Sequence, residues 1–201
     1  MSFNVLIIPE DSTNDQFILK PLIQKMIRQF NRNAIVDVCL DPVLGGLGEA
    51  LKWERLDEII ERYPMVKLFL LIVDRDCEQN RKQKLNNLEA KAIEKFAAER
   101  PATKSRYFFA EHAWQEVEVW TLAGQADLPK NWSMKEIRAD CDPKEAYYEP
   151  YKRAHNKTRK TLGKEAAKNY RRIRQLCPED IGGLEYRVND LFNKERGFYN
   201  T

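Results

Sequence analysis

Three carboxylates stand directly after predicted strands of this chain. Glu10 follows the apolar run at residues 4–8, and Asp74 and Asp76 follow the most hydrophobic stretch, residues 67–73. In a parallel α/β sheet the carboxyl ends of the strands share one edge, where ligands bind. Because the side chains of an extended Asp-x-Asp pair point the same way, we expect the three carboxylates to converge there.

Clustered carboxylates repel one another, and a site that tolerates them typically holds Mg²⁺ or Mn²⁺, which prefer oxygen ligands. Such an ion can polarise a phosphodiester and lower the pKa of an attacking water. The sequence therefore predicts metal-dependent phosphodiester cleavage, with Glu10, Asp74 and Asp76 as both metal ligands and catalytic residues. The alternative is an ordinary solvated strand end, in which residues 74–78 begin the next helix.

The elements that must position these carboxylates alternate between strands and helices. This alternation predicts a doubly wound, Rossmann-like α/β core at residues 1–125, with a parallel sheet of about four strands flanked by helices. Residues 126–201 are predicted to form a helical extension packed on that core. We expect strands at 4–8, 34–40, 67–73 and 106–110, and helices at 15–30, 49–62, 81–100, 114–123, 144–151, 164–176 and 184–192.

The C-terminal part of the chain is basic although the whole chain carries a net charge of only +3. Residues 151–201 hold 13 Lys/Arg against 6 Asp/Glu, or +7, which leaves 21 against 25, or −4, for residues 1–150. Basic side chains with interleaved tyrosines could track a nucleic-acid backbone and stack on unpaired bases. A solvated helix surface and an acidic partner protein remain alternatives. The candidate nucleic-acid contacts are Lys152, Arg153, Arg159, Lys160, Arg171 and Arg172, and the tyrosines are Tyr147, Tyr148, Tyr151 and Tyr170.

The four cysteines lie far apart and form no Cys-x-x-Cys pair, so we expect free thiols in a reducing compartment. The longest apolar run, residues 68–73, is too short to cross a bilayer, and the N-terminus does not resemble a secretion signal. These observations predict a cytoplasmic protein without a membrane partner. The glycines of residues 45–48 are not followed by the Lys-Ser/Thr pair of a phosphate loop, so nucleotide binding is not expected.

The order of the acidic motifs resembles the Toprim domain of topoisomerases, primases and OLD-type nucleases. Residues 8–17 are similar to the Glu-Gly-x-Thr-Glu-Glu opening of small bacterial Toprim-like proteins, with Glu10 at the metal-site glutamate and Asp15 at a second acidic position. Asp11 stands where that family usually has glycine, so the turn there is expected to differ.

The resemblance continues beyond the acidic core. Residues 116–123 resemble a Glu-x-Trp-x-Leu-Ala element, with Glu118 in the matching position. Residues 142–144 resemble a Pro-Lys element, and residues 173–178 resemble a Leu-Arg-x-x-Cys-Pro segment. Glu118 is therefore a candidate metal ligand or general base, or else a core-edge residue that orients Trp120. Lys144 is a candidate for approaching the scissile phosphate, or else a solvated lysine.

This resemblance implies a metal-dependent nuclease acting on DNA or RNA. It also implies an anti-phage defence effector controlled by a partner ATPase of the ABC or OLD type. A second hypothesis is a non-catalytic Toprim-fold subunit that docks an ATPase or nucleic acid. A phospho-acceptor receiver domain is a third, but the Asp-x-Asp pair and the absence of a clear fifth strand argue against it.

Overall fold

The computed structural model describes residues 3–99 and 105–197. Its four strands form one sheet in the order β2-β1-β3-β4, and every neighbouring pair is parallel. This confirms the prediction of an α/β protein with a parallel sheet flanked by helices. The strands are β1 (Asn4–Pro9), β2 (Ile35–Val38), β3 (Leu68–Asp74) and β4 (Tyr107–Ala113).

The helices follow the predicted order with some changes at their boundaries. The predicted helix at 49–62 is divided into α2 and α3, the predicted helix at 164–176 falls into α8 and α9, and α6 was not predicted. Arg100, the predicted end of one helix, lies outside the described residues. The helices are α1 (Gln16–Phe30), α2 (Leu47–Ala50), α3 (Trp53–Arg62), α4 (Arg81–Ala98), α5 (Val117–Ala123), α6 (Met134–Ala139), α7 (Glu149–Ala154), α8 (Arg159–Lys168), α9 (Tyr170–Leu176) and α10 (Gly183–Glu195), with π-helical turns η1 (Lys144–Tyr148) and η2 (Pro178–Gly182).

Both faces of the sheet are buried, which explains the uninterrupted apolar runs of β1 and β3. Successive side chains of a strand point to opposite faces. Val5 and Ile7 accordingly join one core cluster, whereas Leu6 and Ile8 join the other. The first six residues of β3 divide between the two clusters in the same alternating way, and the strand ends at Asp74, which belongs to neither.

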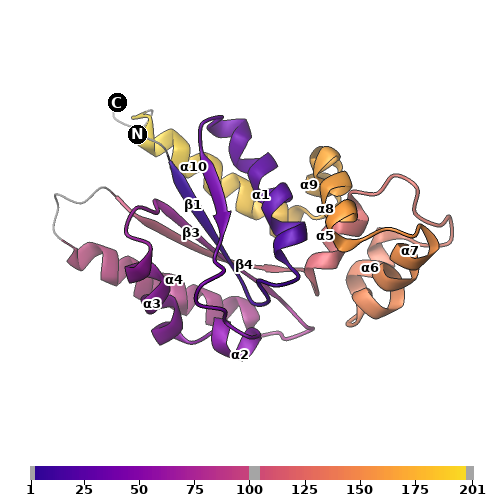
Figure 1. The fold of residues 1–201 in the computed structure, drawn as a ribbon, viewed down its shortest axis with the longest axis horizontal. Helices are drawn as coiled ribbons and strands as arrows, with labels where there is room; N and C mark the ends of the chain where they lie inside the picture. The colour runs from indigo at the N-terminus through magenta and orange to yellow at the C-terminus, as the bar shows by residue number, and fades with distance from the viewer. Residues whose placement is uncertain (1–2, 100–104, 198–201) are drawn as a thin grey trace.

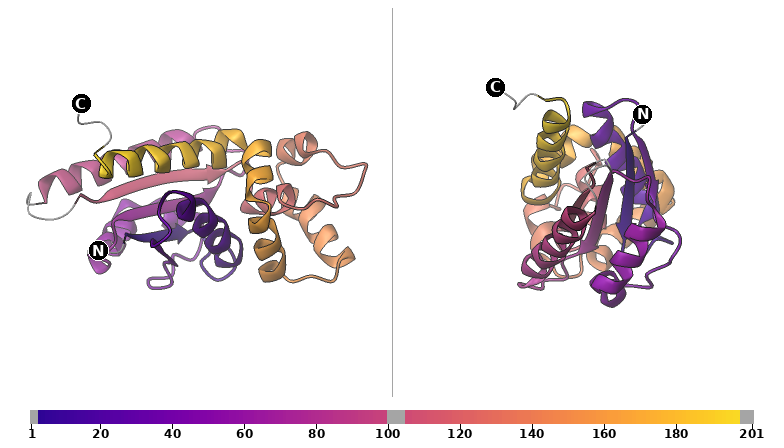
Figure 2. Two further views of the ribbon diagram at one scale, coloured as in Figure 1. Left: turned by 90° about the horizontal axis from the view of Figure 1, so that it is seen from above. Right: turned by 90° about the vertical axis from the view of Figure 1, so that its left-hand side faces the viewer.

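The first cluster continues from the sheet into α1, α5 and α8–α10, and the second lies beneath α2–α4. Figure 1 shows α3 and α4 together on one side of the sheet, and Figure 2 shows the helices from α5 to α9 gathered at one end of it, with α10 running back alongside. The helical extension and the sheet therefore share one hydrophobic core. None of the helices within residues 3–99 and 105–197 has the length and apolar character needed to span a membrane.

Candidate metal centre

Glu10 and Asp74 meet at the carboxyl edge of the sheet, as the strand order requires. The chain passes from β1 to β2 on one side and then crosses to β3 on the other, so the gap between β1 and β3 is the topological switch point. There the Oε2 of Glu10 accepts a hydrogen bond of 3.2 Å from the backbone N–H of Asp74. The two carboxylates thus lie at one site although they are 64 residues apart.

A group of three carboxylates at this edge has the spacing of a metal site. Ligand oxygens of Asp74, Asp76 and Glu116 lie within 4.8 Å of one another. Sequence reasoning did not select Glu116 as a ligand, although it lies only three residues beyond the end of β4. Like Glu10 and Asp74, it follows the carboxyl end of a strand, but the predicted strand ended at residue 110 and β4 continues to Ala113.

The loop after β3 does not have the extended backbone that was expected of the Asp-x-Asp pair. Asp76 and Cys77 adopt left-handed conformations, with φ of 51° and 55°, and so does Gln115, with φ of 71°. The buried Gln115 fixes this loop: its carbonyl accepts hydrogen bonds from the N–H groups of Arg75 and Asp76, and its side-chain Oε1 accepts one from Cys77. A turn held by Gln115 therefore brings Asp76 toward Asp74.

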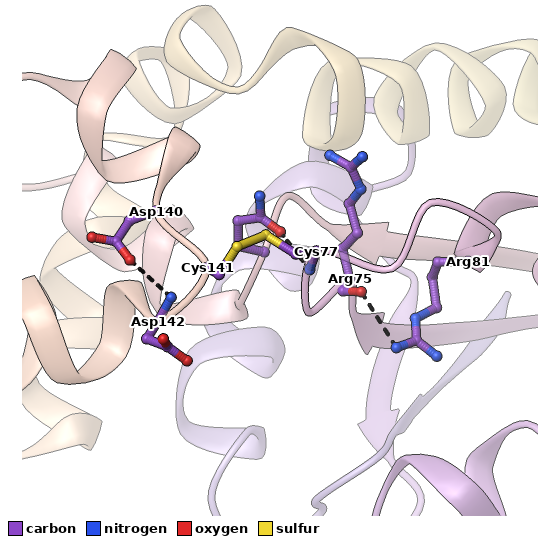
Figure 3. Close-up of a disulfide and its surroundings, with 7 residues drawn as sticks. Arg75, Cys77, Arg81, Asp140, Cys141 and Asp142 are labelled. Carbon is purple, nitrogen blue, oxygen red and sulfur yellow. Dashed lines mark hydrogen bonds between the residues drawn. A yellow bond between two sulfur atoms is a disulfide. The ribbon is translucent and has the colours of Figure 1, made fainter.

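The prediction of four free thiols is wrong for two of the cysteines. Cys77 and Cys141 form a disulfide, with their Cα atoms 5.5 Å apart, while Cys39 and Cys177 are free and buried. The close-up in Figure 3 shows the disulfide joining the loop after β3 to the segment after α6. It links the loop that carries Asp76 covalently to the helical extension. The pairing was not predicted because the two cysteines are 64 residues apart in the sequence.

Burial and mutual repulsion raise the pKa values of the carboxylates. Burial raises the pKa of Asp74 well above its ordinary value, and the charges of Glu10 and Glu118 raise it further. The pKa of Glu10 is also raised, chiefly by burial. Burial raises the pKa of Glu116 to about 7 despite a hydrogen bond from the Lys144 N–H. Burial likewise raises the pKa of Asp76, against the opposing effect of Arg81.

Glu118 lies beside the cluster but is held by cations. Its Oε1 is bound by the guanidinium of Arg159, whose Nη2 also contacts Asp15 at 2.8 Å, and Glu118 and Asp15 are both buried. The Nζ of Lys144 lies 3.9 Å from the same Glu118 oxygen, and its backbone N–H donates to Glu116 at 2.7 Å. Lys144 is thus placed at the edge of the site, whereas Glu118 is occupied by an internal ion pair.

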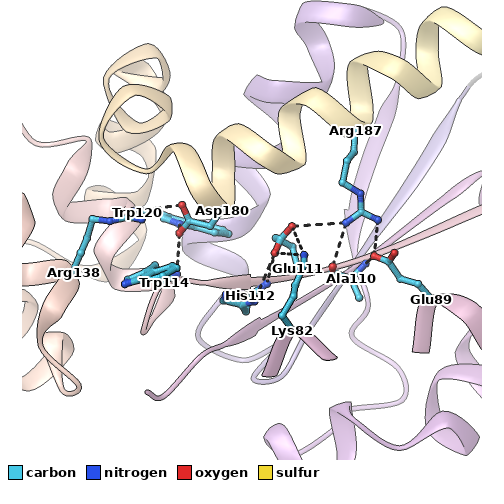
Figure 4. A network of polar contacts seen from close by, with 10 residues as sticks. All are labelled: Lys82, Glu89, Ala110, Glu111, His112, Trp114, Trp120, Arg138, Asp180 and Arg187. Carbon is cyan, nitrogen blue, oxygen red and sulfur yellow. Dashed lines mark hydrogen bonds and ion pairs between the residues drawn. The ribbon is translucent and has the colours of Figure 1, made fainter. Parts of the chain in front are cut away.

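A second network anchors the segment that carries Glu116. Asp180, which is 1% exposed, accepts hydrogen bonds from the Trp114 N–H and from the Trp120 indole, and Arg138 lies 3.4 Å from its other oxygen (Figure 4). Asp180 belongs to η2 of the helical extension, and Trp114 immediately follows β4. The extension therefore fixes the backbone on both sides of Glu116.

The donor set fits a hard divalent cation. Glu10, Asp74, Asp76 and Glu116 each have one carboxylate oxygen engaged with an N–H or guanidinium group, and within the described ranges the other oxygen accepts no hydrogen bond. Each of these carboxylates thus keeps one oxygen for a ligand; those of Asp74, Asp76 and Glu116 have the spacing of a metal site, and Glu10 lies beside them through its contact with the Asp74 backbone. Mg²⁺ and Mn²⁺ prefer such all-oxygen sites, although the geometry does not distinguish between the two ions.

The candidate nucleic-acid contacts have different environments. Arg153, Lys160 and Arg171 are exposed, but Arg159 is committed to Asp15 and Glu118, and Lys152 pairs with Glu149 at 2.6 Å. Arg172 is exposed but donates through Nε to the carbonyl of Ala123 at 3.1 Å. The structure therefore does not leave Arg159 available to a phosphate backbone.

The proposed stacking by tyrosines is not supported for three of the four. Tyr148, Tyr151 and Tyr170 are all at most 3% exposed and belong to the hydrophobic core. Tyr147 is partly buried and packs edge-on against Trp132, with the ring centroids 5.1 Å apart. These buried rings stabilise the extension. An aromatic stripe at helical spacing can form a packing face as readily as a base-stacking face, which is why the stacking prediction failed for them.

Comparisons of this chain with models of protein families, with curated proteins and with solved structures found no match. The candidate site is therefore assigned from its own geometry and chemistry.

Proposed function

We propose that this protein is a divalent-metal-dependent nuclease of the Toprim type, which cleaves phosphodiester bonds of DNA or RNA. The observation that carries this proposal is the grouping of Asp74, Asp76 and Glu116 within 4.8 Å, beside Glu10, at the switch point of a parallel sheet. Nearby carboxylates with raised pKa values are a common arrangement at functional sites.

In this proposal Glu10, Asp74, Asp76 and Glu116 hold Mg²⁺ or Mn²⁺. A bound ion of this kind supplies positive charge to the phosphodiester and lowers the pKa of the attacking water. Asp74 and Glu116 are held in position by the N–H groups of Val117 and Lys144, at 2.8 and 2.7 Å. The Lys144 side chain is 42% exposed, and in this proposal its ammonium binds a substrate phosphate at this edge.

Arg159 and Glu118 have a positioning role in this proposal. The Arg159 guanidinium joins the start of α1, through Asp15, to Glu118 in α5. Since Glu118 is already paired, we propose that it orients the site and that it is neither a metal ligand nor the general base. Burial by itself lowers the pKa of Lys144, but the negative charges of Glu118 and Glu116 outweigh this effect and leave that pKa raised, so the lysine stays charged.

The test is cleavage of DNA, RNA and tRNA with Mg²⁺ or Mn²⁺ by the wild type and by Asp74→Asn. Asparagine keeps an oxygen that can accept the Val117 N–H, so the fold is retained while one anionic ligand is removed. We expect at least a 100-fold loss of activity, of the order that metal-ligand environments control. Asp190→Asn, a change at a partly buried helix position outside the site, is the matched control.

Equal cleavage by the wild type and Asp74→Asn would reject the proposed site. The Arg159 ion pair, which occupies Glu118, also favours a second candidate, a non-catalytic Toprim-fold subunit that docks an ATPase or nucleic acid. Calorimetry distinguishes the two, since a non-catalytic subunit is expected to bind no Mn²⁺.

An ABC- or OLD-type ATPase partner and a role in anti-phage defence belong to the same proposal. Co-purification with such an ATPase tests them.

A further inference from the structure

A groove runs between α1 and α8, away from the carboxylates. Its volume is about 390 Å³. One face of each helix lines the groove. The lining includes four cationic side chains and two amide side chains, and it includes no acidic residue. The lining residues are Pro21, Gln24, Lys25, Arg28, Gln29, Lys164, Ala167 and Lys168.

The four cations of this groove, Lys25, Arg28, Lys164 and Lys168, are all exposed, and within residues 3–99 and 105–197 none of them has an ion pair or hydrogen bond. Other cations on the same helices do have partners: Lys20 pairs with Asp37, and the Arg159 guanidinium is buried against two carboxylates. The only acidic residue of α8, Glu165, is engaged by Lys157 at 2.8 Å. The groove thus concentrates positive charge that the protein itself does not neutralise.

The two helices that line the groove begin near the candidate metal centre. Asp15 directly precedes α1 and Arg159 is the first residue of α8, and the two are joined by their ion pair at the edge of the site. From there Lys164 lies five residues along α8, or about 7 Å, and Lys25 lies ten residues beyond Asp15, or about 15 Å, at 1.5 Å per residue. A polymer with one negative charge per repeating unit could therefore extend from the groove to the carboxylates.

We propose that the α1–α8 groove binds the phosphate backbone of the nucleic-acid substrate and directs it toward the metal centre. Unpaired lysines and arginines are the usual contacts to phosphates, and the glutamine amides can donate to phosphate or sugar oxygens. In this proposal the side chains contact the sugar-phosphate backbone and do not read the edges of the bases. Binding is therefore expected to be independent of base sequence. The proposal deepens the proposed nuclease function, and it rests on that function for the identity of the ligand.

The test measures binding without cleavage. Fluorescent single-stranded DNA and RNA 20-mers are titrated in EDTA with the wild type, with Lys25→Ala/Lys164→Ala and with Lys91→Ala/Lys130→Ala. The control lysines are also exposed but lie outside the groove, Lys91 on α4 and Lys130 before α6. We expect the groove variant to bind at least 10-fold more weakly and its salt-dependence slope to fall by about 2, since each phosphate contact contributes about 1. The control is expected to stay within 2-fold of the wild type.

The proposal is overturned if the groove variant binds as the control does, or if the wild type binds neither oligonucleotide. Binding of poly-glutamate in place of the oligonucleotides, lost in the groove variant, would also overturn it by assigning the surface to an acidic protein. Asp74→Asn separates this result from the proposed function: it should retain binding in EDTA. Binding through the groove without metal-dependent cleavage would remove the nuclease proposal and leave the groove assignment standing.

Discussion

Gly163 of α8 lies directly against the carbonyl oxygen of Phe17 in α1, where any Cβ at residue 163 would overlap that oxygen. Four residues after Phe17 stands Pro21, which has no amide hydrogen to donate to this carbonyl. The missing helical hydrogen bond leaves room on α1 for the backbone of α8. This close approach fixes the position of the start of α8. The Arg159 guanidinium is thereby placed in contact with Asp15 and Glu118.

Gly163→Ala is expected to destabilise the protein by about 1 to 3 kcal/mol, the usual cost of overpacking, because the neighbouring atoms belong to helix backbone. Urea denaturation measures the change. Gly183→Ala is the matched control, since a Cβ there meets no atom within 4 Å, and it should stabilise α10 by up to about 1 kcal/mol. Equal stabilities of the two variants would contradict the packing argument.

Arg159→Met is expected to lower the free energy of unfolding at pH 7 by about 3 to 5 kcal/mol, because it leaves the buried Asp15 without its cation and Glu118 with only the more distant Lys144. Adding Glu118→Gln should restore part of that loss. The deficit should shrink as the pH falls from 7 to 5, since burial raises the pKa of Asp15 to about 7 and its protonation removes one of the unpaired charges. Chemical denaturation of the single and double variants at pH 5 and pH 7 gives the result, and additive losses would argue against the ion pair.

Stability without divalent metal should depend on the protonation of Glu116. Its pKa is raised by burial from 4.5 to about 7 in the folded protein. The folded state therefore holds a proton that the unfolded state releases between these values, and the contribution of Glu116 to stability is lost as the pH rises from about 4.5 to 7. His112 acts in the opposite direction, because burial lowers its pKa to about 4 and its contribution is lost as the pH falls below 6.5.

Glu116→Gln separates these two effects in EDTA: it should reduce the loss on the alkaline side, where Asp74, Glu10 and Asp76 also contribute, and leave the loss on the acidic side unchanged. Because a metal binds the deprotonated carboxylates, Mn²⁺ should raise the Tm of the wild type more at pH 8 than at pH 6. The rise should be much smaller in Glu116→Gln. An equal rise in both proteins would place Mn²⁺ elsewhere.

Reduction of the Cys77–Cys141 disulfide should free the loop that carries Asp76 from the helical extension. We expect the free energy of unfolding to fall by about 2 to 4 kcal/mol and the affinity for Mn²⁺ to weaken. Cys141→Ser should reproduce both effects, whereas Cys39→Ser, at a free buried cysteine, should leave the Mn²⁺ affinity unchanged. Thiol titration of the unreduced, denatured protein should find two free thiols, and four would contradict the disulfide.

The sequence by itself predicted the parallel sheet and the placing of Glu10 and Asp74 at its carboxyl edge. Runs such as residues 67–73 suit strands of a parallel sheet that is covered by helices on both faces, and the carboxyl ends of parallel strands, with Glu10 and Asp74, share one edge. These features depend on local hydrophobicity and on the direction of the strands. Both can be read from neighbouring residues in the chain.

Only the tertiary structure decided which other side chains complete the site. Glu116 joins Asp74 and Asp76 because a left-handed turn at Gln115 and the anchoring of Trp114 by Asp180 set the path of the backbone. Glu118, two residues away, is instead paired with Arg159 from α8. The disulfide, the buried tyrosines and the groove between α1 and α8 likewise depend on contacts between distant segments. Residue type and spacing do not specify such contacts, because helical periodicity shows that a face is buried but not which segment covers it.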